Sequence, residues 1–194
     1  MEDTKIAQPK GGFAHPFFPT RDPERRWLFK LTLTVPAGVS SFPSTGGGGQ
    51  GPTASTAQEI LSFNAQNVTV PSVNIDAITI PHLNQDVKVA GRPTLGDMSV
   101  TLLNSYDLQA VRVIEAWHRL IYRPSTETLG FAANYKTNGT LFVYKPNFDV
   151  FKRYDIKGVW PAVVGDMEYD WSASDSVTRT ITFHVDKVIH MDDV

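Results

Sequence analysis

The sequence of 194 residues contains no cysteine, so neither a disulfide framework nor a thiolate metal site can form. It has no basic excess either: 18 lysines and arginines stand against 20 aspartates and glutamates, a formal net charge of −2. Nucleic-acid-binding proteins usually show a basic excess or a basic stripe. No window approaches the roughly 18 apolar residues of a membrane span, and the first residues do not resemble a secretory signal. We therefore expect no membrane insertion and synthesis in a reducing cytoplasm.

Motifs for nucleotide binding and hydrolysis are also missing. The glycine run 46–49 is followed by Gln50-Gly51-Pro52 without the lysine of a phosphate-binding loop, so it predicts a flexible loop. There is no Gly-x-Ser-x-Gly elbow to support a hydrolase serine. His184 and Asp186 begin a possible metal site but have no third ligand at suitable spacing. We expect no enzyme activity and no cofactor.

Three alternating carboxylates, Asp166, Glu168 and Asp170, would share one face of a strand. The calcium-loop pattern fails, because Trp171 and Val177 stand where glycine and glutamate are needed. A glycosidase would need a partner carboxylate and a sugar cleft. These residues are better interpreted as a solvated or channel-facing acidic stripe.

The length suits one domain preceded by an arm. Residues 1–25 carry four prolines and a Gly-Gly pair, which interrupt regular structure, but also three phenylalanines that a solvated tail would not need. We interpret them as an N-terminal arm that docks on its own domain or on a neighbour. Residues 26–194 form the domain, and residues 36–57 are predicted to be a long Gly-rich loop.

Most of the domain has the signals of β-strands. From Trp27 to Val35 every odd position is apolar, which predicts one buried and one wetter face. One helix is expected from Asp107 to Tyr122, with an apolar stripe that includes Trp117. The fold class is therefore mainly β, a β-sandwich or barrel with one packed α-helix. The other predicted strands lie within 68–80, 86–90 (paired with 98–103), 140–144, 156–164, 167–171 and 177–189.

Three segments resemble the tail tube proteins of contractile-tailed bacteriophages, a family similar in fold to the type VI secretion tube protein. The first runs from Val70-Pro71 through residues 74–103, and the second is the helix with its late Trp117. The third and most specific is the block from Gly158-Val159-Trp160-Pro161 to Ile181-Thr182-Phe183. The resemblance covers about residues 26–190. The long arm and the Gly-rich loop depart from the compact family pattern.

The resemblance implies a structural subunit of the virion tail. Hexameric rings with a continuous inner β-barrel would stack into a hollow tube inside a contractile sheath, and double-stranded DNA would pass through it into the host. The implied partners are the tail sheath, tape measure, baseplate and tail terminator proteins. One alternative is a baseplate protein of the same fold that initiates the tube. Another is a carbohydrate-binding β-sandwich that uses aromatic side chains, namely Tyr135, Phe142, Tyr144 and Phe148.

By analogy with this family, strands within residues 74–103 should contribute to the inner barrel. Alternate residues of a barrel strand point inward and outward. Val87 and Val89 should then face protein, as should Val73 and Ile75. The predicted channel-lining residues are Asn74, Asp76, Asp86 and Lys88.

Overall fold

The structure is a computed structural model, and it describes residues 24–41, 54–104, 109–167, 169–172 and 174–192. Most of the predicted arm and the glycine run lie outside these residues. The elements in chain order are β1 (Phe29–Leu33), the 3-10 helix η1 (Ala37–Ser41), α1 (Ala54–Asn64), β2 (Ala65–Thr69), β3 (Val73–His82), β4 (Gln85–Leu95), β5 (Met98–Leu103), α2 (Gln109–Ile121), β6 (Tyr122–Arg123), β7 (Thr128–Leu129), α3 (Ala132–Tyr135), β8 (Thr137–Tyr144), β9 (Val150–Val164), β10 (Thr178–His184) and β11 (Lys187–Asp192).

Two antiparallel sheets share the long strand β9. Sheet A consists of β1, β8, the first half of β9 and β11, whereas sheet B consists of the second half of β9, β10, β5 and β2, in those orders. Strands β3 and β4 pair only with each other. The mainly β architecture is confirmed, although the sheets do not close into a barrel within the subunit.

The core fills the space between the two sheets and the helices. On β5, alternate residues are buried, as period-2 patterning requires. On β10 the buried residues are Ile181 and Phe183, which lie two positions apart and therefore share one face. The remaining core comes from β1, β8, β9, η1, α1 and α2, and includes Leu31, Leu33, Val39, Ala57, Leu61, Leu141, Ile156 and Val159.

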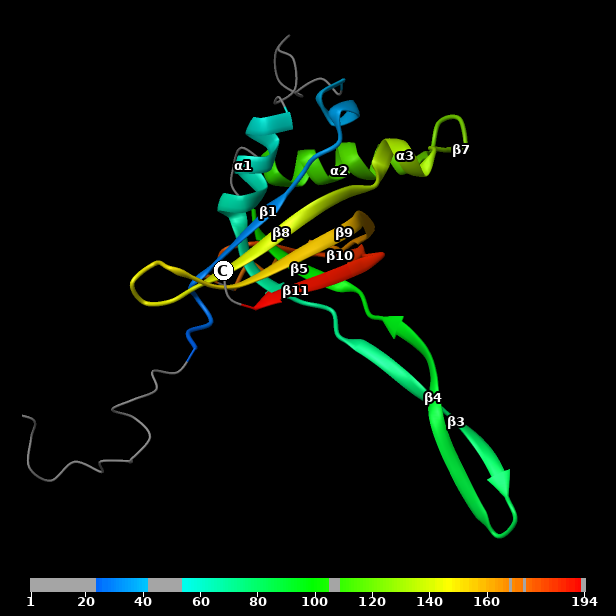
Figure 1. The fold of residues 1–194 in the computed structure, drawn as a ribbon. Coiled ribbons are helices and arrows are strands. Elements are labelled where there is room, and N and C mark those ends of the chain that lie inside the picture. Colours follow the sequence, from blue (N-terminus) through cyan, green and yellow to red (C-terminus); the bar gives the residue numbers. More distant parts are fainter. Residues whose placement is uncertain (1–23, 42–53, 105–108, 168, 173, 193–194) are drawn as a thin grey trace, which may run out of the picture.

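Helix α2 holds the predicted apolar stripe against the sheets. Trp117 is fully buried, its ring centroid lies 5.9 Å from that of Phe183, and its Nε1 donates a hydrogen bond to the Tyr135 carbonyl at 2.8 Å. The polar end of the indole is thus satisfied inside the core. Helices α1 and α2 lie together over one side of the strands (Figure 1). The predicted packing of Trp117 within its own subunit is confirmed.

The prediction of a single helix was wrong. Residues 37–41 form η1, and α1 begins at Ala54, within the segment expected to be a loop. Ala57 and Leu61 bury one side of α1 against the core, where the helix contacts β1 and α2. The apolar stripe of α1 is narrow, so tertiary packing rather than a strong sequence pattern makes this segment helical.

Strand assignments also changed in three places. Strand β4 continues through Gly91 and Pro93 and pairs with β3, so β5 is not its hairpin partner. Described residues between Gly165 and Val177 form no strand, and residues 177–189 span two strands, β10 and β11. Before β1 the alternation fails, because Trp27 is exposed and Leu28 is buried.

Replacing Trp117 by alanine should lower the free energy of unfolding by about 3–5 kcal/mol, because a large buried ring and its hydrogen bond are both lost. Thermal or denaturant unfolding of the purified variant measures this. The exposed Trp171 provides the matched control, since Trp171→Ala should change stability by no more than about 0.5 kcal/mol. Equal midpoints for the two variants would contradict the packing of α2.

Candidate subunit-assembly surfaces

The β3–β4 hairpin extends away from the two sheets (Figure 1). All ten residues of β3 are exposed, although many are apolar. Isolated two-stranded hairpins are marginally stable in water, and monomers rarely expose large apolar patches. The hairpin therefore presents a surface suited to another protein chain. Its exposed large apolar side chains are Val73, Ile75, Ile78, Ile80, Leu83, Val87 and Val89.

The hairpin register assigns these side chains to faces. Ile78 pairs with Val89 and Ile80 with Val87, so the four share one face, which we call the apolar face. Their neighbours on the other face include two pairs, Thr79 with Lys88 and Pro81 with Asp86.

The four predicted channel residues divide between these faces. Asp86 and Lys88 lie opposite Val87 and Val89, as expected. Asn74 and Asp76 instead have the same parity on β3 as Ile78 and Ile80, so alternation places them on the side of the apolar face. The Asn74 amide donates to the Asp76 carboxylate at 3.2 Å. All four are exposed, and their position along a channel stays a prediction.

The sandwich is open between strands β1 and β2, each of which pairs on one side only. A groove of about 1010 Å³ lies there, with apolar lining from Phe29, Val68, Leu141, Val143 and Tyr154. Unpaired strand edges are templates for pairing with another chain. The open edge and the groove are therefore a second candidate assembly surface.

The outward face of sheet B is polar but uncharged along three strands. Across these strands Asn67 pairs with Thr101, which pairs with Thr180, and the Thr101 and Thr180 hydroxyls lie 3.2 Å apart. One step along, the paired residues are Thr69, Ser99 and Thr182. On these described strands the outward-facing paired residues include no lysine, arginine, aspartate or glutamate. We call this surface the hydroxyl face.

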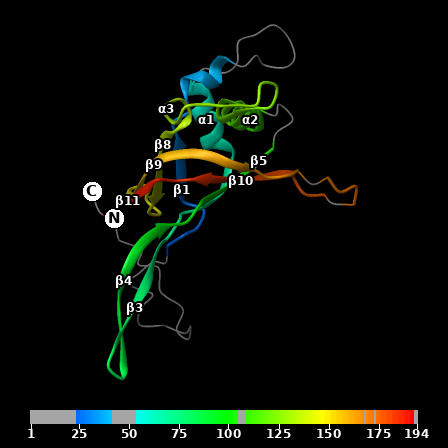
Figure 2. The same cartoon turned by 90° about the vertical axis from the view of Figure 1, so that its right-hand side faces the viewer.

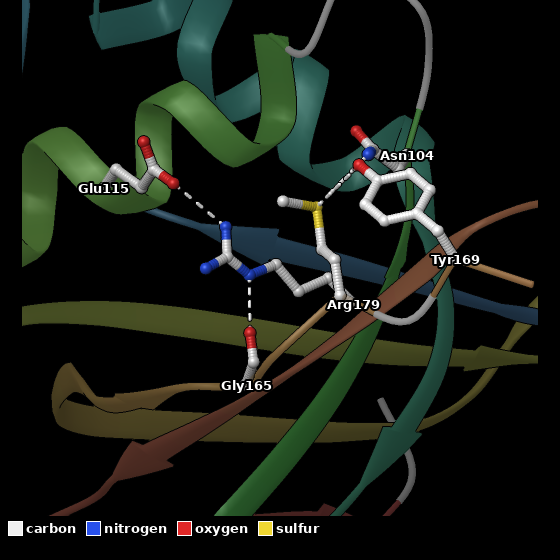
Figure 3. A network of polar contacts seen from close by, with 6 residues as sticks. Asn104, Glu115, Gly165, Tyr169 and Arg179 are labelled. Carbon is white, nitrogen blue, oxygen red and sulfur yellow. Dashed lines mark hydrogen bonds and ion pairs between the residues drawn. The ribbon is translucent and has the colours of Figure 1, made fainter.

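A partly buried arginine anchors the connection between β9 and β10. The side chain of Arg179 is 13% exposed, and it donates to the Gly165 carbonyl at 2.6 Å and to Glu115 on α2 at 3.0 Å (Figure 3). Nearby, the Met167 sulfur accepts hydrogen bonds from Asn104 at 3.5 Å and from the Tyr169 hydroxyl at 3.7 Å. The start of this connection is therefore anchored to both the helix and the sheet.

Residues 169–172, which we call the aromatic turn, project from this anchored segment. Tyr169 is 71% exposed and Trp171 is completely exposed at 104%. The turn is closed by Ser172, whose backbone N–H and hydroxyl both donate to Asp170. Hydrogen bonds from the Ser172 backbone, and then from its side chain, hold the pKa of Asp170 below its ordinary value. A hydrogen-bonded turn therefore displays an indole that is fully exposed among the residues that the structure describes.

The other sequence-based site candidates do not come together. The expected stripe of Asp166, Glu168 and Asp170 is not on a strand, and Glu168 lies outside the described residues. His184 Nδ1 lies 2.5 Å from Asp97, whereas Asp186 pairs with Lys136. No group of three potential metal ligands occurs among the residues that the structure describes.

The aromatic residues proposed for a carbohydrate surface are also scattered. Phe142 and Tyr144 stack on β8 and are half-buried, whereas Tyr135 packs edge-on against Trp160. Phe148 is exposed at the β8–β9 turn. These side chains do not form an exposed row. No helix in the described ranges is long and apolar enough to span a membrane.

Sequence comparison identifies the family. The profile described as "Phage tail tube protein" matches residues 25–189, which is most of the chain. The chain belongs to this family. The tail tube protein of Enterobacteria phage T4 is 27% identical over 129 residues, covering 65% of this chain and 79% of that protein. The tail tube protein of Serratia phage KSP90 is 21% identical over 159 residues, covering 80% of this chain and 81% of that protein. Proteins of this family are structural tail components.

Solved structures show the same fold for this tail tube protein. One is the sheath–tube complex of an extracellular contractile injection system, with a TM-score of 0.61 and 12% identity over 93% of this chain and 99% of that one. Another is the tube-terminating cap of the anti-feeding prophage, with a TM-score of 0.62 and 14% identity over 89% and 93% of the two chains. The fold is thus one found in contractile injection systems.

Replacing Ile78 and Val89 by serine should weaken self-association of the tail tube protein without unfolding its body, because both side chains lie on the hairpin outside the core. Sedimentation velocity over a concentration series measures association, and thermal unfolding checks the body. The matched control is Ala77→Ser with Ala90→Ser, a pair on the opposite face. Equal self-association of the two double variants would show that the apolar face is not a contact surface.

Proposed function

We propose that the protein forms hexameric rings that stack into the hollow tube of a contractile phage tail, through which the genome enters the host. Its partners would be further copies, the surrounding sheath, the tape measure protein, and the baseplate and terminator proteins at the two ends. The subunit would be made in the host cytoplasm and act in the virion, in a role that requires no catalysis.

The observation that carries this proposal is that sheet B has unpaired strand edges, which a ring of subunits could pair. Sheet B ends at β2, whose outer edge has no partner strand, and at the second half of β9 on the other side. Pairing these unlike edges between copies would extend the sheet around a ring and remove the edges. Cyclic symmetry joins unlike surfaces head to tail in this way. Family membership and the fold shared with a sheath–tube complex support the same assembly.

The hydroxyl face is the surface we assign to the channel wall. In a ring closed through sheet B, one face of the sheet is the protein core and the other faces the lumen. Threonine, serine and asparagine keep that wall hydrated, and they offer phosphate no cationic surface. Phosphate contacts with lysine and arginine dominate non-specific DNA affinity, so their absence favours rapid transit. A channel position for Asn74, Asp76, Asp86 and Lys88 on the hairpin stays a parallel prediction.

A role at the base of the tube is the alternative within this fold. The long N-terminal segment, residues 1–25, favours it, because baseplate proteins that start a tube often carry such additions. The structure also resembles a protein of the anti-feeding prophage baseplate, with a TM-score of 0.58 and 10% identity over 89% of this chain and 97% of that one. A tube initiator would form single rings, whereas a tube subunit would polymerise without limit.

Electron microscopy of the purified full-length protein at increasing concentration tests the proposal. We expect stacked rings or tubes of constant diameter with a central channel. Single rings that never stack would favour the initiator role. A protein that stays monomeric at every concentration would contradict assembly, and glycan-array binding by that monomer would favour the carbohydrate-binding alternative.

Placing lysines on the hydroxyl face should slow genome ejection. Thr69→Lys with Thr180→Lys adds two cations per subunit on exposed positions of sheet B, and the slowing should be largest at low salt, where phosphate attraction is unscreened. Ejection is timed by dye release from virions carrying the variant, with Thr69→Gln and Thr180→Gln as the uncharged control. The parallel pair Asp76→Lys with Asp86→Lys tests the hairpin. If the variant with lysines on the hydroxyl face ejects its genome at the wild-type rate, this face does not form the channel wall.

A further inference from the structure

Two exposed features with large apolar side chains, the β3–β4 hairpin and the aromatic turn, emerge from opposite ends of sheet B. At one end, Thr69, Ser99 and Thr182 are neighbours, and the β3–β4 hairpin leaves the sheet between Thr69 and Met98. At the other end, Thr178 pairs with Leu103, and the connection that carries the aromatic turn leads into β10. Figure 2 shows the hairpin and this connection on opposite sides of the subunit. They are therefore separated along the direction of the same strands.

The aromatic turn has the properties of an anchor for another chain. Trp171 is fully exposed, but the backbone under it is held by the hydrogen bonds of Ser172 to Asp170. A large ring on an ordered turn loses little conformational freedom when it becomes buried, and tryptophan is among the residues enriched at binding hot spots. The same connection carries the acidic residues Asp166, Asp170 and Asp175, of which Asp170 is held by Ser172.

The apolar face of the hairpin offers a complementary surface. Ile78, Ile80, Val87 and Val89 form an exposed aliphatic patch that an indole could cover. The hairpin also carries Lys88 and Arg92, and neither of these has an ion-pair partner within the described ranges of the chain. These cations lie on the same element as the aliphatic patch, Lys88 on its opposite face beside Asp86, and Asp76 is the other carboxylate of the hairpin.

We propose that the aromatic turn of one copy packs on the β3–β4 hairpin of a copy in the adjoining ring. This inference rests on the proposed tube and assigns the contact that stacks its rings. Strands of a closed barrel run with a tilt along its axis, so the two ends of sheet B face the rings above and below. Translation along the axis then brings the aromatic end of one copy to the hairpin end of the next.

The chemistry of the two ends favours this head-to-tail contact over symmetric ones. Two aromatic turns facing each other would bring together the carboxylates of Asp166, Asp170 and Asp175 from both copies, and like charges repel. Unlike surfaces at opposite ends of one chain generate an open-ended repeat rather than a closed dimer. Such a repeat is what a tube of unlimited length requires.

Replacing Trp171 by serine should leave rings intact but raise the protein concentration needed for tubes by about tenfold or more, as loss of a hot-spot tryptophan does. Analytical ultracentrifugation separates rings from tubes, and electron microscopy confirms their identity. Phe131→Ser is the matched control, because Phe131 is also an exposed aromatic residue, 82% exposed, but precedes α3. Because Trp171 makes no contact in the subunit core, the folded body should be unaffected, and thermal unfolding verifies this.

Cross-linking locates the contact directly, since a chain without cysteine gives no background. Ser174→Cys beside the aromatic turn is combined with Ile80→Cys on the hairpin, and assembled tubes are treated with a short bis-maleimide. A ladder of covalently linked copies is expected. Ser174→Cys combined with Phe63→Cys, an exposed position on α1, should give no ladder.

The outcomes separate this contact from the tube itself. Wild-type protein that forms neither rings nor tubes would overturn the proposed function. Wild-type tubes together with unchanged tube formation by Trp171→Ser, or with no Ser174–Ile80 ladder, would overturn only the stacking contact. Rings that persist while tubes are lost for Trp171→Ser but not for Phe131→Ser support it.

Discussion

Strand β9 is the element on which the rest of the subunit depends, because both sheets are built on it. Its first half pairs with β8 and β11 and its second half with β10, so the sheets meet along one strand. The change of partner occurs at Gly158, where φ is +67° and an added Cβ would lie 2.1 Å from an Asp186 carboxylate oxygen. Only glycine fits comfortably there. The two sheets are joined at β9 and separate at their opposite edges, where the groove between β1 and β2 lies.

The open edges between β1 and β2 offer contact surfaces for other copies of the chain. Assembly can therefore be the function of a chain whose described part contains no cysteine, no group of metal ligands and no catalytic cluster. The core includes the fully buried Trp117, together with apolar side chains from both sheets and from helices α1 and α2. At the periphery, the edge of β2 lacks a partner strand, and the hairpin and the aromatic turn expose apolar side chains. In the assembly we propose, each unsatisfied feature is completed by another copy, and the hydroxyl face is left for the channel.

Local patterning predicted the elements that pack within the subunit. Alternation located β1, β5 and β10, and the stripe of α2 correctly buried Trp117, because side-chain periodicity reports directly on a core. Helix α1 was missed because, among its residues with a described side chain (55–64), only Ala57 and Leu61 are fully buried. The pairing of β4 with β3 was missed because Gly91 and Pro93 usually end strands, and the hairpin tolerates them only because its edges bear no other strand. The aromatic turn was predicted to be a strand because the carboxylates at positions 166, 168 and 170 alternate, but a short alternating run can also occur in a turn.

The hairpin exposes apolar surface before assembly, and two features of its sequence oppose aggregation. Prolines at positions 81 and 93 remove N–H donors from its strands, and Lys88 and Arg92 add charge beside them. Both features discourage further strands from pairing with its edges. Neither feature protects the apolar face, where Ile78 and Ile80 lie beside Val89 and Val87. A chain that blocks its edges but leaves this face open is suited to side-chain packing rather than to strand addition. Contact between the hairpin and a neighbouring ring should therefore be made through this face, and an indole is a side chain large enough to cover it.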